Sequence, residues 1–119
     1  MSEITTHVLD LARGTPAAGV DVTLERADSR GAYSRVGHGI TDADGRVQSF
    51  GATAVYDDRA GAGPVRHRLT FAVGAYFAAM RAECFFPEVS VTFDAAPGTA
   101  RCHVPLLVSP FGYSTYRGS

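Results

Sequence analysis

Apolar and polar residues alternate along this chain, and that period of two constrains its fold more than any other feature. The alternation is clearest over residues 20–25 and 88–94, and it returns over residues 65–73 and 5–9. Because successive side chains of a strand point to opposite faces, each segment predicts a half-buried β-strand. His67 interrupts the apolar stripe of residues 65–73.

Segments rich in glycine, proline and aspartate separate the predicted strands. They lie at residues 14–19, 28–31, 42–45, 57–64 and 95–98. Short strands joined by such turns are typical of a sandwich. With 119 residues and 45% apolar content, the chain is long enough to bury a core. We therefore expect an all-β sandwich and a single domain over residues 1–119.

One segment departs from the alternation. Residues 74–82 are rich in good helix formers and end before Pro87, which predicts a short helix with Tyr76 and Met80 on one side. The least organised segment is 52–64, which we interpret as an exposed loop, with a short strand over 54–56 as an alternative.

Charge and composition exclude some classes of partner. Eleven basic and twelve acidic residues give a net charge of −1, so no general field attracts nucleic acid or an anionic membrane. No apolar run could span a bilayer, and the first ten residues do not have the pattern of a signal peptide. We expect a cytoplasmic protein whose partners are small molecules or proteins.

The two cysteines, Cys84 and Cys102, lie far apart and outside any Cys-x-x-Cys spacing. A reducing compartment would keep them as thiols, and we interpret both as core or half-core residues. Cys102 lies between Arg101 and His103, so a reactive thiolate at this position is a minor alternative.

Candidate chemistry comes from the predicted strands and from the last residues of the sequence. His7 and His103 each lie in a predicted strand, and Arg46 follows the turn at 42–45. Two imidazoles can share base and acid roles near neutral pH, and a guanidinium can bind an oxygen that gains charge. The sequence ends with a phenol ring, a guanidinium, a flexible glycine and a hydroxyl: Tyr116, Arg117, Gly118 and Ser119. The combination fits hydrolysis of an acyl bond.

Each of these residues also has a structural explanation. A histidine in a strand is more often a hydrogen-bonded structural residue, and an arginine after a turn is more often a solvated charge. We assign His38 and His67 to the structural class. Asp42 and Asp44 suggest a calcium loop, but its first and twelfth ligand positions fall on residues that cannot serve. No local pair of ligands has zinc-finger spacing, so we predict no metal site.

Five blocks along nearly the whole chain resemble the transthyretin-related 5-hydroxyisourate hydrolases. They are residues 6–20, 39–46, 74–77, 86–89 and 103–119. The Tyr-Arg-Gly-Ser sequence at 116–119 is the most distinctive of these marks, because the hormone-transport relatives of the same fold do not keep it. Many relatives carry an aromatic residue where this chain has Cys102. Alternation sends Cys102 to the face opposite His103, so we expect altered packing there.

The resemblance implies a transthyretin-like sandwich of two four-stranded sheets with one short helix, assembled as a homotetramer that is a dimer of dimers. It implies hydrolysis of 5-hydroxyisourate to 2-oxo-4-hydroxy-4-carboxy-5-ureidoimidazoline in urate degradation, a part of purine catabolism, without a cofactor. The family's site would lie in a groove between dimers. Carried over to this sequence, its catalytic residues are His7, Arg46, His103 and Ser119, and its substrate-binding residues are Tyr116, Arg117 and Gly118.

Under this hypothesis one of His7 and His103 is the general base, the other is an acid or orients water, and Arg46 binds a substrate oxygen. Ser119 would align water or relay a proton, while Arg117 would bind substrate or fix the segment 116–119. The sequence does not decide between the two histidines. The alternative function is a non-catalytic small-molecule binding protein of transthyretin type, and a structural sandwich of a larger assembly is a third interpretation.

Overall fold

The computed structural model describes residues 3–56, 63–95 and 101–119. In chain order the elements within these ranges are β1 (Glu3–Asp10), β2 (Thr15–Pro16), β3 (Asp21–Ala27), β4 (Tyr33–Ile40), β5 (Arg46–Val47), the 3₁₀ helix η1 (Ala52–Ala54), β6 (Val65–Phe71), α1 (Val73–Ala78), β7 (Val89–Ala95), β8 (Arg101–Ser109) and β9 (Gly112–Thr115).

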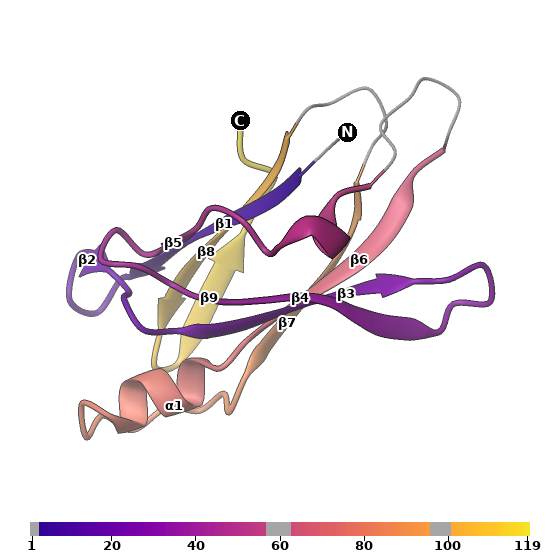
Figure 1. Ribbon diagram of the computed structural model, residues 1–119. Helices are drawn as coiled ribbons and strands as arrows, with labels where there is room; N and C mark the ends of the chain where they lie inside the picture. The colour runs from indigo at the N-terminus through magenta and orange to yellow at the C-terminus, as the bar shows by residue number, and fades with distance from the viewer. Residues whose placement is uncertain (1–2, 57–62, 96–100) are drawn as a thin grey trace.

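The strands form two sheets that pack face to face (Figure 1). One sheet has the order β4-β3-β6-β7, and the other has the order β2-β1-β8-β9 with β5 also paired to β1. The predicted all-β sandwich with one short helix is therefore confirmed. The second sheet has five strands because β2 and β5, two residues each, both pair with β1. Only β1 and β8 run parallel among the described pairs.

Alternation places the core between the sheets. Val22 and Leu24 of β3 and Leu69 and Phe71 of β6 are fully buried and face the apolar side of the other sheet. In β7 the residues at 90, 92 and 94 are exposed while Val89 is buried. The strands predicted at 20–25 and 88–94 are thus confirmed, because burial of one face is what creates a period of two.

The helix is shorter than predicted. It covers Val73–Ala78, so Val73 begins the helix instead of ending the strand stripe of residues 65–73. Arg81 adopts a left-handed conformation with φ of 57°, and the N–H of Ala82 donates to the carbonyl of Phe77 over 3.0 Å. This closure ends the helix several residues before Pro87.

A buried carboxylate ties the helix to the first strand. Asp10 is 1% exposed and accepts a hydrogen bond of 2.8 Å from the Tyr76 hydroxyl. It also accepts the backbone N–H groups of Ala12 and Arg13 over 3.0 and 3.1 Å. Arg13 in turn contacts the sulfur of Met80 over 3.1 Å. Tyr76 contacts the last residue of β1 and Met80 contacts Arg13 just beyond it, so the two side chains lie on one side, as their spacing predicted.

The segment 52–64 is only partly the exposed loop that we expected. Residues 52–54 form η1, and of the short strand expected over 54–56 only a β-bridge at Tyr56 is present. Ala54 and Tyr56 belong to the core with exposures of 0% and 5%. Arg26 of β3 ties this segment to the sheet, because its guanidinium donates to the carbonyl of Ala54 over 3.1 Å. Residues 57–62 of this segment, and 96–98 of the last predicted turn, lie outside the described residues.

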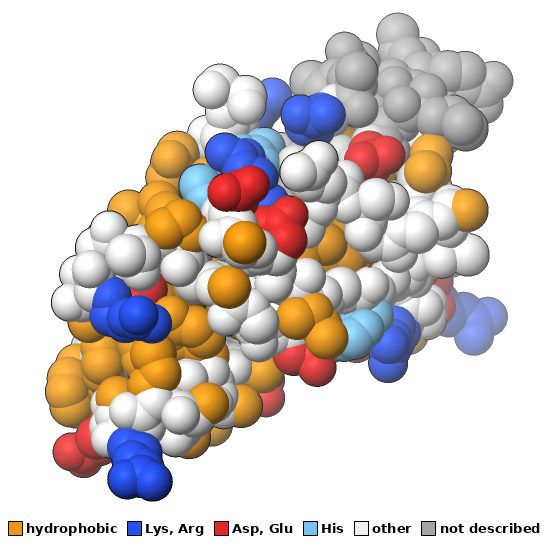
Figure 2. Space-filling view, turned by 60° about the vertical axis from the view of Figure 1, so that its left-hand side comes forward, with side chains coloured by type: hydrophobic (Ala, Val, Ile, Leu, Met, Phe, Trp, Pro, Cys, Tyr) orange, Lys and Arg blue, Asp and Glu red, His pale blue; other side chains and the backbone are white. Residues whose placement is uncertain are grey.

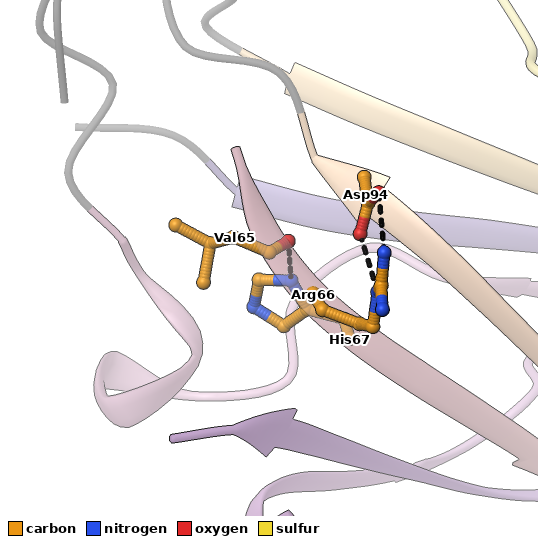
Figure 3. A network of polar contacts seen from close by, with 4 residues as sticks. All are labelled: Val65, Arg66, His67 and Asp94. Atoms are coloured by element: carbon orange, nitrogen blue, oxygen red, sulfur yellow. Dashed lines mark hydrogen bonds and ion pairs between the residues drawn. The ribbon is translucent and has the colours of Figure 1, made fainter. Parts of the chain in front are cut away.

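His67 is the polar centre of the core. It is fully buried, and its Nδ1–H donates to the Val65 carbonyl over 2.9 Å (Figure 3). Its Nε2 accepts from the Arg26 Nε–H over 2.9 Å, so the two bonds fix one neutral tautomer. Burial lowers the pKa of His67 to about 4, and the Arg26 charge acts in the same direction. The structural role predicted for His67 is confirmed by this geometry.

The buried His67 predicts a loss of stability in acid. Its pKa is lower in the folded than in the unfolded protein, so the unfolded state binds more protons between pH 6.5 and about 4. The free energy of unfolding should fall by about 3 kcal/mol across that window. Urea unfolding at several pH values should show this slope in the wild type and a much smaller one in His67→Gln.

His38→Gln is the matched control for this experiment. His38 lies exposed on β4 beside Asp21, so its loss should leave most of the slope in place. Equal slopes in the wild type and His67→Gln would contradict the prediction.

Candidate active site

Strand register brings three of the predicted catalytic residues to one face. In the parallel β1–β8 ladder Thr5 is opposite His103, and in the antiparallel β1–β5 ladder His7 is opposite Arg46. Residues opposite each other, and residues two apart along a strand, share a face of the sheet. His7, Arg46 and His103 therefore lie together on the outer face. Figure 2 shows histidine and basic side chains next to each other on one side of the molecule.

A tight turn positions Arg46. The Asp42 carboxylate accepts the backbone N–H groups of Asp44 and Arg46 over 2.9 and 3.0 Å. Gly45 has a φ of +76°, and a Cβ there would lie 2.4 Å from the Val8 carbonyl oxygen. Only glycine allows this approach, and the Val8 N–H donates to the Gly45 carbonyl over 2.7 Å. The turn thus docks on β1 and fixes the start of β5.

The segment 116–119 lies over His103. The Gly118 N–H donates to the His103 carbonyl over 2.8 Å, and the two residues form a β-bridge. A Cβ on Gly118 would lie 2.5 Å from Cδ2 of the His103 ring. The ring therefore packs directly on the backbone of Gly118, which places the segment at the edge of the outer face.

One cavity of about 300 Å³ collects most of the predicted site residues. Its lining is Arg46, Arg101, His103, Tyr116, Gly118 and Ser119. His7 lies opposite Arg46 in the ladder but does not line this cavity. Arg117 lines a neighbouring cavity of about 450 Å³, which His103 also borders. Figure 1 places the end of the segment beside the upper ends of β1 and β8, far from α1.

His103 sits in surroundings that favour its neutral form. Burial lowers its pKa most, and electrostatic interactions with Arg46, His7 and Arg101 lower it further. A neutral imidazole at neutral pH can accept a proton, so His103 has the properties of a general base. Arg46 is exposed at the cavity and can donate hydrogen bonds to an oxygen of a bound molecule.

Sequence reasoning missed two residues of this region. Thr5 places its hydroxyl 2.8 Å from Nδ1 of His103, and Arg101 lines the cavity. Thr5 shares a face with His7 by strand alternation, and Arg101 shares a face with His103 because it lies two residues earlier. Alternation alone could therefore have placed both residues beside the predicted site. Threonine is also common in strands because of its β-propensity, so its presence in the sequence did not by itself indicate a place in the site.

Cys102 points away from the outer face. It packs against the core, as alternation predicted, and burial raises the pKa of its thiol while the Arg117 charge partly opposes that shift. A thiolate at neutral pH is thus disfavoured, which argues against the reactive alternative. Cys84 is likewise half-buried and free.

Neither a metal-binding cluster nor a membrane-spanning helix is found in the described residues. Among the described residues there is no group of three or more histidine, cysteine, aspartate or glutamate side chains arranged to hold a metal ion. In the same residues no helix has the length and apolarity needed to cross a membrane.

Gly118→Ala should disturb His103. The added Cβ would collide with Cδ2 of the ring, so the segment or the ring must move and expose the imidazole. Since burial is the main cause of the low pKa of His103, that pKa should rise toward 6.5 in an NMR titration. Gly112→Ala is the control, because the nearest atom to its Cβ is 3.9 Å away. An unchanged titration of His103 in Gly118→Ala would refute this close packing.

The comparisons with known proteins agree with the geometry. A model of the HIUase/Transthyretin family matches residues 4–118. The chain is 42% identical over 123 residues to the 5-hydroxyisourate hydrolase of Caulobacter vibrioides, with 100% of each chain covered.

Two solved structures are also similar. The Klebsiella pneumoniae 5-hydroxyisourate hydrolase gives a TM-score of 0.81 at 36% identity, covering 100% of both chains. Sea bream transthyretin in complex with thyroxine gives a TM-score of 0.82 at 26% identity, covering 98% of this chain and 94% of the other. The resemblance found in the sequence is therefore confirmed, and the chain belongs to the HIUase/Transthyretin family.

Proposed function

We propose that this protein is an enzyme that hydrolyses 5-hydroxyisourate in urate degradation. One observation carries the proposal: the neutral imidazole of His103 and the guanidinium of Arg46 line the same cavity as the segment 116–119. The curated relative from Caulobacter vibrioides, named a 5-hydroxyisourate hydrolase, matches this chain over its full length. The product is 2-oxo-4-hydroxy-4-carboxy-5-ureidoimidazoline.

His103 acts as the general base in this proposal. It removes a proton from a water molecule as the water oxygen bonds to the ring carbonyl carbon of the substrate. Arg46 donates hydrogen bonds to the carbonyl oxygen as negative charge builds on it. The carbon–nitrogen bond then breaks and opens the ring, and the nitrogen takes a proton from an imidazolium. The new carboxylic acid loses its proton to solvent, so the single product bears a carboxylate. His103 lines the cavity and His7 does not, which favours His103 as the base.

The other site residues support these two. His7, opposite Arg46 on β1, orients the water or returns a proton to the leaving nitrogen. Ser119 aligns the water or relays a proton, and Tyr116 and Gly118 contact the substrate at the cavity wall. Arg117, which lines the neighbouring cavity, fixes the segment 116–119. These roles use only side chains of the protein, and we propose no cofactor.

A coupled assay tests the function. Urate oxidase generates 5-hydroxyisourate in a cuvette, and its absorbance is followed with and without this protein. The wild type should accelerate the decay, and His103→Gln and Arg46→Gln should each lower the rate by about 100-fold or more. Because the pKa of His103 is lowered, the rate should hold as pH falls to 6.5 and decline only below it.

Arg35→Gln is the matched control for the arginine variant, since Arg35 is exposed on β4 in the other sheet. Its rate should equal that of the wild type. Binding of the substrate without any acceleration would point to a carrier of the transthyretin type and would overturn the proposed enzyme.

We also propose that the domain of residues 1–119 assembles as a homotetramer, a dimer of dimers, in the cytoplasm. Strands β7 and β9 each lie at one end of their sheet order, so each offers an edge for pairing. Near these edges Phe85 and Phe111 are 72% and 66% exposed. Figure 2 shows apolar side chains gathered over the end of the molecule that carries α1. Exposed apolar groups of this kind favour an interface between copies.

Light scattering coupled to size exclusion measures the assembly. The wild type should elute with the mass of four chains, and Phe85→Glu should shift it toward the monomer or dimer because a charge would be buried at the interface. Ile40→Glu is the control, since Ile40 is 60% exposed on β4. A wild type with the mass of one chain would contradict the tetramer.

A further inference from the structure

A threonine outside the predicted site touches the proposed base. The Thr5 hydroxyl oxygen lies 2.8 Å from Nδ1 of His103, and Thr5 is only 6% exposed. The ladder places the two residues directly opposite each other on neighbouring strands. The contact is therefore set by the backbone of the sheet and not by a flexible surface side chain.

The His103 ring is held at two positions. Thr5 occupies Nδ1, and the backbone of Gly118 packs against Cδ2. With Nδ1 engaged, Nε2 is the ring nitrogen left to exchange a proton with a bound molecule. A ring held at both positions also loses little freedom when substrate arrives.

The threonine hydroxyl suits both protonation states of the ring. Its oxygen can accept an N–H, and its O–H can donate to a bare nitrogen. When the neutral ring carries its proton on Nδ1, the Thr5 oxygen accepts it and Nε2 is free to take a proton from water. When Nε2 has taken that proton, the imidazolium still donates its Nδ1–H to Thr5.

We propose that Thr5 is a positioning residue for His103. Its hydroxyl orients the ring so that Nε2 faces the cavity, and it accepts the Nδ1–H of the imidazolium that forms during hydrolysis. This inference rests on the proposed function, because it assigns Thr5 a part in the same reaction. Thr5 itself touches the imidazole and not the reacting atoms.

Two substitutions of Thr5 separate the hydroxyl from the shape of the side chain. Thr5→Val removes the hydroxyl and keeps the branching, while Thr5→Ser keeps the hydroxyl. We expect kcat to fall about 10-fold to 100-fold in Thr5→Val, the range seen when a group that orients a metal-ligating histidine is removed. KM should change by less than about 2-fold. Thr5→Ser should restore most of kcat.

The adjacent threonine supplies a matched control. Thr6 is also buried in β1, but its hydroxyl donates to the backbone carbonyl of Val104 over 2.6 Å and not to an imidazole. Thr6→Val should lower the melting temperature without the fall in kcat. A fall in kcat equal to that of Thr5→Val would overturn the assignment of Thr5.

NMR of the ring nitrogens gives a readout that does not depend on activity. The ¹⁵N shifts of His103, assigned with His103→Gln, report its tautomer and its pKa. In Thr5→Val the pKa should fall, because the imidazolium loses a hydrogen-bond acceptor, and the tautomer populations should change. Thr5→Ser should match the wild type. If Thr5→Val unfolds, Thr5→Ala replaces it with the same expectation.

The two proposals can fail separately. If the wild type does not accelerate decay of 5-hydroxyisourate, the proposed function fails, and the nitrogen shifts still decide whether Thr5 orients His103. If the wild type is active but Thr5→Val keeps the same kcat, nitrogen shifts and pKa, the proposal for Thr5 is overturned.

Discussion

The parallel register of β1 and β8 is the constraint on which the site depends. It sets Thr5 opposite His103, and the antiparallel pairing of β1 with β5 then sets Arg46 beside His7. A slip of β8 by one residue against β1 would send the imidazole of His103 to the core face, and a slip of β5 would do the same to the guanidinium of Arg46. That slip is opposed by the buried face of β1, where Ile4 and Val8 are fully enclosed. Packing of the core therefore fixes the geometry of the outer face.

Neighbouring residues of one strand have opposite chemical properties because of this arrangement. His103 faces the cations of the outer face, and burial and charge both favour its uncharged form. Cys102, one residue earlier, packs against the core, where burial also favours its uncharged form. The uncharged imidazole is the form that can accept a proton, whereas the uncharged thiol is the unreactive form of cysteine. β8 thus presents the imidazole of His103 on the outer face and keeps the thiol of Cys102 unreactive against the core.

Local patterns predicted the strands well because one face of each is buried, as at residues 20–25. They failed where distant contacts decide the structure. The segment around Ala54 packs in the core and accepts a hydrogen bond from the distant Arg26. The helix α1 is closed by Arg81 in a left-handed conformation, at a position where the sequence has no glycine to indicate it. In the site, strand position and family resemblance located His103. The contact of Thr5 with His103 was missed because it depends on the register between β1 and β8, which the sequence of either strand alone does not give.

The hydrogen bond between Thr5 and His103 joins residues 98 positions apart in the chain. Closing a loop of this length costs conformational entropy, and contacts of such wide separation are associated with slow folding. A nascent chain that still lacks β8 has neither this bond nor a cavity around the imidazole. Competence for chemistry therefore requires that β1 and β8 have already paired.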